Sequence, residues 1–287
     1  MKLLVTGGTG FVGKRLVERF NEKFYLRMIA RSKEKASFAQ SLGVEILYGN
    51  ILDSDFVHLA CKGIDCVIHL AATYNLKNAV KNNVDSTKNI IYACQRNNVN
   101  KIVFMSSINS KFKKQGTYSL SKKLCEKEIL NSHLDYTILR PTFIYDDNGG
   151  IFIKQLLKFI KKFRIAPIIG TGEYRIQPIH LDDVISIIEK ILFNHKERIY
   201  DLVGPDILTY KTLTDMIYDS LGIKRKIKIH LPLIFLKYFG SFVGIGKDKV
   251  LEIDEDRTAN PEIIKKELNM PLIEIATKLD LMIRNIH

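Results

Sequence analysis

Four glycines among the first thirteen residues follow directly on an aliphatic run, and this arrangement constrains the fold more than any other feature of the chain. Residues 2–6 read KLLVT, which predicts a short buried strand, and residues 14–20 have the apolar spacing of an amphipathic helix. The segment 7–13 between them reads GGTGFVG and fits both G-x-G-x-x-G and G-x-x-G-x-x-G. Such a turn lets backbone approach a pyrophosphate at the N-terminus of a helix. In this context the pattern favours a dinucleotide-binding turn over a glycine-rich turn without a ligand.

After this turn, short apolar runs alternate with helical patterns through the first half of the chain. Strands that alternate with helices at this pace predict an α/β fold, a doubly wound parallel sheet of the Rossmann type. The further predicted strands are 25–30, 44–48, 66–70 and 101–105, with a helix over 86–96.

Beyond residue 144 the alternation loosens, which indicates a second, smaller lobe. We expect the NAD(P)-binding domain to span residues 1–144 and to regain 176–203. The remaining segments, 145–175 and 204–287, are expected to form an α+β substrate-binding lobe.

The residues after the second predicted strand bear on the choice of cofactor. An acidic residue there suits the ribose 2′-hydroxyl of NAD, whereas a basic residue suits the 2′-phosphate of NADP. The chain has Arg31 and Ser32 at this place. This favours NADP over NAD, although an arginine can also stack on adenine.

Composition restricts the partners. The net charge of +13, from 44 Lys and Arg against 31 Asp and Glu, raises nucleic acid, an anionic membrane or a phosphorylated ligand as partners. The excess is spread along the chain without a recognisable nucleic-acid module, so we expect a small phosphate-bearing ligand and no nucleic acid. The four cysteines have no metal-ligand spacing and the chain begins with a strand, which predicts a reduced, cytoplasmic protein without a metal.

A serine pair and a Tyr-x-x-x-Lys segment follow the fifth predicted strand. Tyr118 and Lys122 are one helical turn apart, so the ammonium can lie beside the phenol. A neighbouring cation lowers the pKa of a phenol and suits it to general acid–base catalysis. Ser107, at a strand end, is suited to hydrogen-bond a hydroxyl or a carbonyl. The alternative for so short a pattern is a solvated lysine next to a half-buried tyrosine.

Six motifs occur in a fixed order, namely the segments 5–13, 69–72, 83–87, 106–107, 118–122 and 140–142. Together they resemble the short-chain dehydrogenase/reductase superfamily, in its extended NAD-dependent epimerase/dehydratase branch. The resemblance implies that Ser107, Tyr118 and Lys122 form a catalytic triad and that Asn83 helps to hold the active-site helix. It points less specifically to substrate contacts at Thr73 and Arg175. The implied cofactor-binding residues are Gly7, Gly10, Phe11, Val12, Gly13, Arg31, Ser32, Asn50, Ile51, Leu70, Ala71, Ala72, Tyr118, Lys122 and Pro141.

Departures from the family pattern leave the substrate open. Asn50 stands where an aspartate is usual, and only ten residues separate Ser107 from Tyr118. We expect reversible hydride transfer at a hydroxyl or ketone, with a nucleotide-linked sugar as the substrate. One alternative is a ketone reductase that resembles dihydroflavonol reductases, and another is a non-catalytic cofactor-sensing or assembly protein.

The second lobe yields four local predictions. Residues 149–164 predict a basic amphipathic helix with Phe163 inward, His180 predicts a packing residue, and Asp182 or Asp183 predicts the N-cap of a helix. The apolar stretch 229–246 predicts a helix over the substrate cleft or at a homodimer surface, and peripheral membrane contact is disfavoured.

Overall fold

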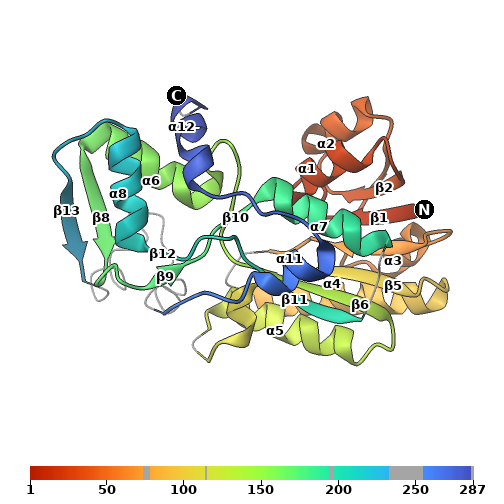
Figure 1. Cartoon of the computed structure of the whole chain (residues 1–287). Helices are drawn as coiled ribbons and strands as arrows, with labels where there is room; N and C mark the ends of the chain where they lie inside the picture. Colours follow the sequence, from red (N-terminus) through yellow and green to blue (C-terminus); the bar gives the residue numbers. More distant parts are fainter. Residues whose placement is uncertain (74–77, 114, 194–196, 233–254, 286–287) are drawn as a thin grey trace. The chain divides into compact units, whose positions relative to one another are not determined.

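The computed structural model describes residues 1–73, 78–113, 115–193, 197–232 and 255–285, which divide into two compact units (Figure 1). Unit 1 comprises Met1–Lys111, Thr117–Arg140 and Ile185–Tyr200. Unit 2 comprises Phe112–Gly116, Pro141–Val184 and Asp201–His287. The assignment of unit 2 to substrate binding stays a prediction.

Unit 1 is built on a seven-stranded sheet in the order β11-β6-β5-β4-β1-β2-β3. The five pairings from β6 across to β3 are parallel. The order reverses at β1, which lies between β2 and β4, and ligands of doubly wound folds bind at the carboxyl ends of the strands at this switch point. The predicted fold class is confirmed. The strands are β1 (Lys2–Thr6), β2 (Tyr25–Ala30), β3 (Glu45–Tyr48), β4 (Cys66–His69), β5 (Lys101–Met105), β6 (Asp135–Pro141) and β11 (Arg198–Leu202).

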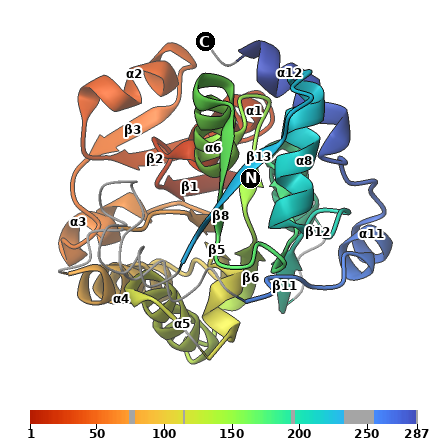
Figure 2. The ribbon, with the colours of Figure 1, turned by 90° about the vertical axis from the view of Figure 1, so that its left-hand side faces the viewer.

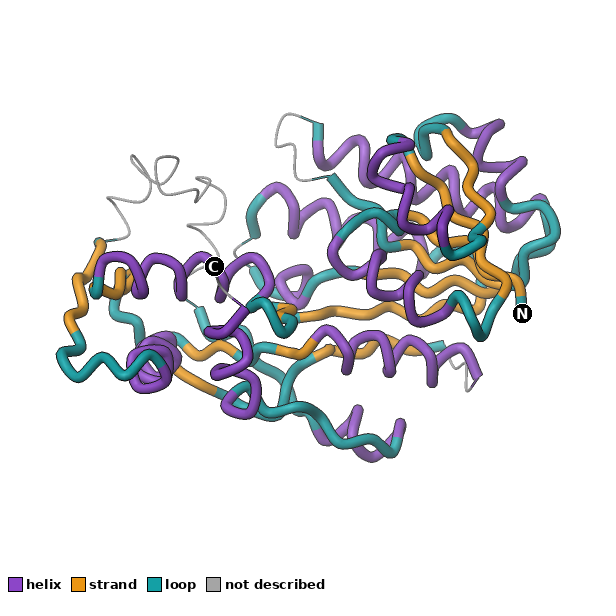
Figure 3. Tube along the Cα trace, turned by 90° about the horizontal axis from the view of Figure 1, so that it is seen from above, coloured by secondary structure: helices purple, strands orange, loops and turns teal. Residues whose placement is uncertain are grey.

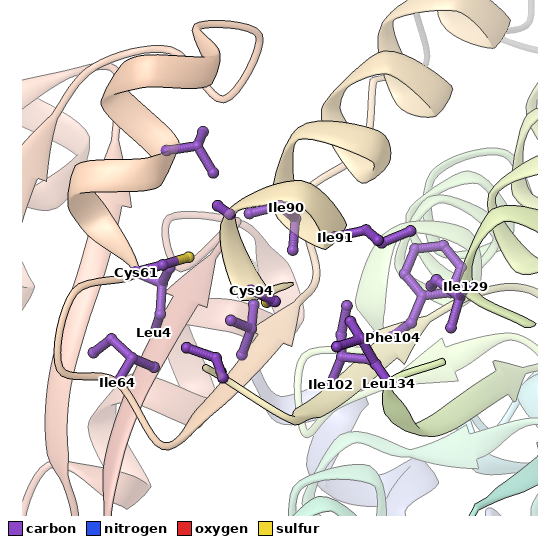
Figure 4. Packing of buried hydrophobic residues seen from close by; sticks show 14 of the residues in the cluster. Leu4, Cys61, Ile64, Ile90, Ile91, Cys94, Ile102, Phe104, Ile129 and Leu134 are labelled. Atoms are coloured by element: carbon purple, nitrogen blue, oxygen red, sulfur yellow. The ribbon is translucent and has the colours of Figure 1, made fainter. Parts of the chain in front are cut away.

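Helices cover both sides of this sheet (Figure 3). A parallel strand that is covered on both faces must be apolar along its whole length, and the four residues of β4 are buried. Figure 4 shows Ile90 and Ile91 of the helix over residues 79–96 with Ile102 and Phe104 of β5. The helical segments are α1 (Phe11–Phe20), α2 (Lys33–Ser41), α3 (Ser54–Ala60), α4 (Ala79–Arg96), the 3₁₀ turn η1 (Ile108–Lys111), α5 (Thr117–Leu130) and α7 (Leu181–Phe193), which runs from unit 2 into unit 1.

Two helices of unit 1 begin earlier than the sequence indicates. α1 begins at Phe11 rather than at residue 14, because Gly10 is already its N-cap in an extended conformation. α4 begins at Ala79, seven residues before residue 86.

Unit 2 is organised around a core of its own, in which Tyr145, Tyr210 and Tyr218 are the largest side chains. Two strands, β8 and β13, pair in parallel beside this core (Figure 2). The elements of unit 2 are β7 (Ile144–Tyr145), α6 (Gly150–Phe163), β8 (Ile165–Ile169), β9 (Arg175–Ile176), β10 (Ile179–His180), β12 (Leu208–Thr209), α8 (Tyr210–Ser220), β13 (Ile227–Leu231), α11 (Glu262–Leu268) and α12 (Ala276–Asn285).

Several local predictions in this unit are wrong. Phe163 is 50% exposed instead of inward, since it is the last residue of α6 and lies beyond the buried residues of that helix, of which Ile160 is the last. Asp182 and Asp183 lie inside α7 and do not cap it; the ring Nδ1 of buried His180 accepts the Asp182 N–H at 3.2 Å instead. His180 also meets the Tyr145 ring edge-on, with ring centres 5.1 Å apart, as a packing residue does.

The apolar stretch 229–246 does not begin as a helix. Its first residues complete β13, which ends at Leu231, and its residues from 233 onward lie outside the described residues. Among the helices of the described residues, none has the length and apolarity that crossing a bilayer requires.

Candidate active site

The glycine turn after β1 is packed so tightly that two of its glycines are required by the protein itself. Gly7 has φ +76°, and a Cβ there would lie 2.6 Å from the Ala71 nitrogen. A Cβ on Gly13 would lie 2.2 Å from the Gly7 carbonyl oxygen. Any larger residue at either position collides with backbone, which side-chain movement cannot relieve.

Gly10 differs from these two. Among the described residues, and apart from its chain neighbours, the one atom within 4 Å of an added Cβ is the Gly7 oxygen, at 3.2 Å. The space beside Gly10 is therefore open, at the N-terminus of α1, where backbone N–H groups and the helix dipole attract anions. The first turn of α1 has no acidic residue. The donor set fits a pyrophosphate, next to exposed Phe11 and half-buried Val12.

On the adenosine side, the predicted residues follow β2 and β3. Arg31 is exposed, and the Ser32 hydroxyl caps α2 by accepting the Lys35 N–H at 3.3 Å. The Asn50 side-chain oxygen accepts the Leu52 N–H at 3.1 Å, which makes a local turn. Asn50 therefore shapes the loop that also holds half-buried Ile51.

A buried chain of hydrogen bonds behind the glycine turn was not anticipated. The Thr6 hydroxyl lies 2.6 Å from His69 Nδ1, the other ring nitrogen lies 3.2 Å from the Thr87 hydroxyl, and that hydroxyl donates to the Asn83 carbonyl at 2.8 Å. Thr6 also accepts the Ala71 N–H at 3.3 Å. Since each hydroxyl has one proton, Thr6 donates to Nδ1 and His69 donates from Nε2.

This network holds a neutral histidine. Burial, with a smaller effect of the Lys122 charge, lowers the pKa of His69 to about 3. The network fixes the end of β4. The residues that follow it, Leu70, Ala71 and Ala72, are half-buried. Its signal in the sequence is the motif 69–72, in which Leu70, Ala71 and Ala72 were predicted to bind the cofactor and His69 was given no role.

Asn83 connects the loop after β4 to the helix α5. Its side-chain oxygen accepts the Thr73 N–H at 2.8 Å, and its amide nitrogen lies 3.2 Å from the Thr73 carbonyl oxygen. The same nitrogen donates to the Ser121 hydroxyl at 2.9 Å, one residue before Lys122. Asn83 thus positions the loop after β4, through the backbone of Thr73, and the helix α5, through Ser121.

Lys122 lies in the interior of unit 1. It is 2% exposed, and its ammonium donates to the Met105 carbonyl at 2.6 Å. The nitrogen lies 4.6 Å from the Phe104 ring centre and 5.8 Å from the Tyr118 ring centre. Desolvation lowers the pKa of Lys122 to about 8, against smaller raising effects of Cys125 and Glu126. The alternative of a solvated lysine is therefore wrong.

Ser107 follows the buried end of β5 and is half-buried, with its hydroxyl accepting the Asn109 N–H at 3.3 Å. Behind it lies a second feature that the sequence analysis missed, a buried carboxylate at Glu126. Arg140 donates to Glu126 twice, at 2.9 and 2.6 Å, and the hydroxyls of Ser106 and Ser110 donate to it as well. Glu126 stands four residues after Lys122 on α5, which is a signal available in the sequence.

Within unit 1, the Lys122 ammonium lies beside the Tyr118 ring and bonds to Met105, two residues before Ser107, while Asn83 bonds to Ser121, the neighbour of Lys122. The other two predicted residues belong to unit 2. Pro141 is the buried last residue of β6. Arg175 is mostly exposed and engaged with Asp256, which accepts its backbone N–H at 2.7 Å and its side chain at 2.8 Å. Among the described residues, no three His, Cys, Asp or Glu side chains gather as metal ligands would.

A glycine turn at the switch point of a parallel sheet defines a dinucleotide-binding protein of the Rossmann class. The sequence model of the NAD(P)H-binding family matches residues 7–162, which include the glycine turn and the Tyr-x-x-x-Lys segment. The chain belongs to this NAD(P)H-binding family.

Solved structures with the same fold are epimerases and dehydratases of the predicted branch. UDP-glucuronic acid 4-epimerase from Bacillus cereus, in complex with UDP-glucuronic acid and NAD, matches with a TM-score of 0.80 at 20% identity over 100% of this chain and 99% of that chain. dTDP-glucose 4,6-dehydratase from Bacillus anthracis, with NAD, has a TM-score of 0.80 at 17% identity over 99% and 96%. The resemblance to this branch is confirmed, and at these identities the likeness is one of fold.

The proteins that resemble this chain in sequence include names other than epimerase and dehydratase. NADH dehydrogenase (ubiquinone) 1 alpha subcomplex subunit 9, mitochondrial, of Dictyostelium discoideum is 24% identical over 96% of this chain and 82% of its own length. The 2-alkyl-3-oxoalkanoate reductase of Stenotrophomonas maltophilia is 24% identical over 64% of this chain and 62% of its own length. The family model shows an NAD(P)H-binding protein, and its fold is the one that these epimerases and dehydratases share.

Proposed function

We propose that this protein is an NAD(P)-dependent enzyme that transfers a hydride at a secondary alcohol or ketone, with Tyr118 as the general acid and base. The observation that carries the proposal is the burial of Lys122 beside Tyr118. A buried ammonium lowers stability, because its pKa is depressed by burial. Such a cost is typical of functional sites.

The charge of Lys122 acts on the Tyr118 phenol. Bringing a phenol from its ordinary pKa of ~10 to neutral pH requires about 4 kcal/mol. The ammonium lies 5.8 Å from the ring centre, and a cation ~6 Å from the phenolate charge would supply roughly 3 kcal/mol at an effective dielectric constant of about 20. When bound, the nicotinamide supplies or accepts the hydride and, in its oxidised form, adds a second positive charge.

The other residues of the site bind and orient. Ser107 would hydrogen-bond the substrate oxygen, next to the phenol that exchanges its proton. Asn83 would hold α5 and the Thr73 loop at a constant separation, through the hydrogen bonds that it makes to each. The N-terminus of α1 would hold the pyrophosphate beside Gly10.

For the cofactor we propose NADP. Arg31 is exposed directly after β2, and the N-terminus of α2 follows it. Both attract the 2′-phosphate, and Arg is suited to bind it through two donors.

For the substrate we propose a nucleotide-linked sugar, with Arg175 and Thr73 as further contacts. Support comes from the solved epimerases and dehydratases, which match over nearly the whole chain. A free ketone is the alternative favoured by the reductase relative. A non-catalytic, cofactor-holding subunit is the alternative favoured by the NADH dehydrogenase relatives, one of which matches over 96% of this chain.

One experiment separates these alternatives. The purified chain is incubated with NADPH or NADP and a panel of UDP-, GDP- and dTDP-sugars and small ketones, with NMR of the products and absorbance of the reduced nicotinamide. An epimerase changes the sugar without net oxidation, whereas a reductase consumes NADPH. If Tyr118→Phe binds cofactor normally and every substrate of the wild-type chain is still turned over at the wild-type rate, the proposal is wrong. Cofactor binding with no turnover of any substrate favours the non-catalytic subunit.

A further inference from the structure

Two basic segments that are far apart in the sequence lie at the same end of unit 2. β8 and β13 pair in parallel with their first residues opposite each other (Figure 2). The segments just before them, 161–164 and 224–226, are therefore neighbours. The Tyr218 hydroxyl bridges the two, since it lies 2.5 Å from the Ile227 carbonyl oxygen and 3.3 Å from that of Arg164.

This end carries a concentrated positive charge, and we call it the basic end. The segments 161–164 and 224–226 carry six cationic side chains and no acidic one, and one of the six, Lys226, pairs with Asp219 at 2.6 Å. Cations that face solvent in such a cluster raise the local potential and attract an anionic surface. The six residues, all exposed, are Lys161, Lys162, Arg164, Lys224, Arg225 and Lys226.

Exposed apolar side chains accompany the charge. Phe159 follows Ile151 by eight residues along α6 and Phe163 follows Phe159 by four, and the three side chains are 69%, 39% and 50% exposed in chain order. The two phenylalanine rings are 4.8 Å apart, and the Lys162 ammonium lies 5.1 Å from the Phe163 ring centre. None of the three is among the buried residues of α6, which pack on the unit 2 core.

We propose that the basic end and the exposed stripe of α6 bind the surface of an anionic phospholipid bilayer. Lysines and arginines attract the headgroups, and aromatic rings between them enter the boundary of headgroups and acyl chains. A second copy of the chain is a poor occupant, because it would oppose the same positive charges. Charge alone would also suit a nucleic acid, but the apolar stripe specifically favours a lipid boundary. The inference is independent of the catalytic proposal.

Vesicle flotation tests this inference with the whole chain. The probes are vesicles of phosphatidylcholine with and without phosphatidylglycerol, at ~0.1 M salt. We expect binding only to vesicles that contain the anionic lipid, and at least ~20-fold weaker partitioning for Lys161→Glu/Lys162→Glu, at roughly 1 kcal/mol for each cation. Lys224→Glu/Arg225→Glu should lose binding to the same extent, although it is far away in the sequence.

The matched control is Lys265→Glu/Lys266→Glu on α11, which changes the net charge equally elsewhere on unit 2. This variant should stay within about threefold of the wild type. Far-ultraviolet circular dichroism and NADPH binding verify that each variant is folded.

The stripe is tested separately. Phe159→Ser/Phe163→Ser should still bind at low salt but dissociate at a lower salt concentration than the wild type, since only the electrostatic part remains. Equal losses in the α11 control, no binding of the wild type to anionic vesicles, or a single-stranded oligonucleotide that displaces the chain from vesicles through the same residues would each overturn the proposal.

Discussion

The Lys122 ammonium lies 5.8 Å from the centre of the Tyr118 ring while donating to the Met105 carbonyl in the interior of unit 1. The helix α5 sets this relationship, because residues four apart share one face. Met105 ends β5, so the same hydrogen bond ties the helix to the sheet. An ion that is buried at this position has consequences for activity and for stability that differ in sign.

Replacement of Lys122 should separate activity from stability. Lys122→Met removes the cation that acts on the phenol, and we expect turnover to fall by ~10²–10³. The same change removes a buried ammonium whose pKa lies about 2.5 units below its ordinary value, so the free energy of unfolding at pH 7 should rise by as much as ~3 kcal/mol. Steady-state kinetics and urea titration measure the two effects.

Lys123→Met is the matched control, since Lys123 is the next residue on α5 and is exposed. It should leave both quantities near those of the wild type. A variant of Lys122 that is inactive and much less stable would indicate a structural lysine instead.

Because His69 is buried and neutral, the stability of the folded chain should decrease in acid. The unfolded chain binds a proton at this histidine below pH ~6.5, whereas the folded chain keeps it neutral down to about pH 3. The unfolded state therefore binds more protons in this window, and the free energy of unfolding should decrease by up to ~1.4 kcal/mol for each pH unit of acidification.

His69→Gln tests the origin of this slope. Chemical denaturation between pH 4 and 7 should have a shallower pH dependence in the variant, because glutamine does not titrate. An unchanged slope would attribute the acid sensitivity to other groups.

Alanine substitutions at two glycines of the turn should have different effects, one on folding and the other on cofactor binding. Gly13→Ala places a Cβ 2.2 Å from the Gly7 carbonyl oxygen, so the chain should be destabilised by several kcal/mol or fail to fold. In Gly10→Ala the added Cβ meets one atom of the described part of the chain, at 3.2 Å. We expect this variant to fold, with cofactor binding at least ~10-fold weaker because the methyl group enters the proposed pyrophosphate site.

Thermal unfolding and NADPH fluorescence titration distinguish the two variants. If Gly10→Ala binds the cofactor as the wild type does, the pyrophosphate lies elsewhere.

Arg31 predicts the preference between the cofactors. Arg31→Glu should reduce kcat/KM with NADPH by ~10-fold or more relative to NADH, because a carboxylate repels the 2′-phosphate and suits the free ribose hydroxyl. The ratio of the two cofactors is its own control, since damage to folding affects both. An unchanged ratio of kcat/KM for the two cofactors would show that Arg31 does not contact the cofactor.

Much of the secondary structure of unit 1 could be predicted from the sequence. The residues KLLVT, the glycine turn and the alternating apolar runs specify strand, turn and helix locally, and β1, β2 and β5 have the predicted bounds. Ser107, Tyr118, Lys122 and Asn83 could be named as candidates from their order, because spacing along a helix and position after a strand are local properties.

Other features exist only because distant segments meet. Burial of Lys122 depends on the packing of α5 against β5, the Glu126–Arg140 pair joins α5 to β6, and the His69 network joins β1, β4 and α4. The outward Phe163 and the joining of residues 161–164 with 224–226 depend on how unit 2 fills its core and pairs β8 with β13. Local spacing along the chain determines which face of a helix or strand a side chain is on. Desolvation and long-range hydrogen bonds depend on neighbours from distant segments, which only the tertiary structure supplies. These neighbours set the burial and the pKa of Lys122 and His69.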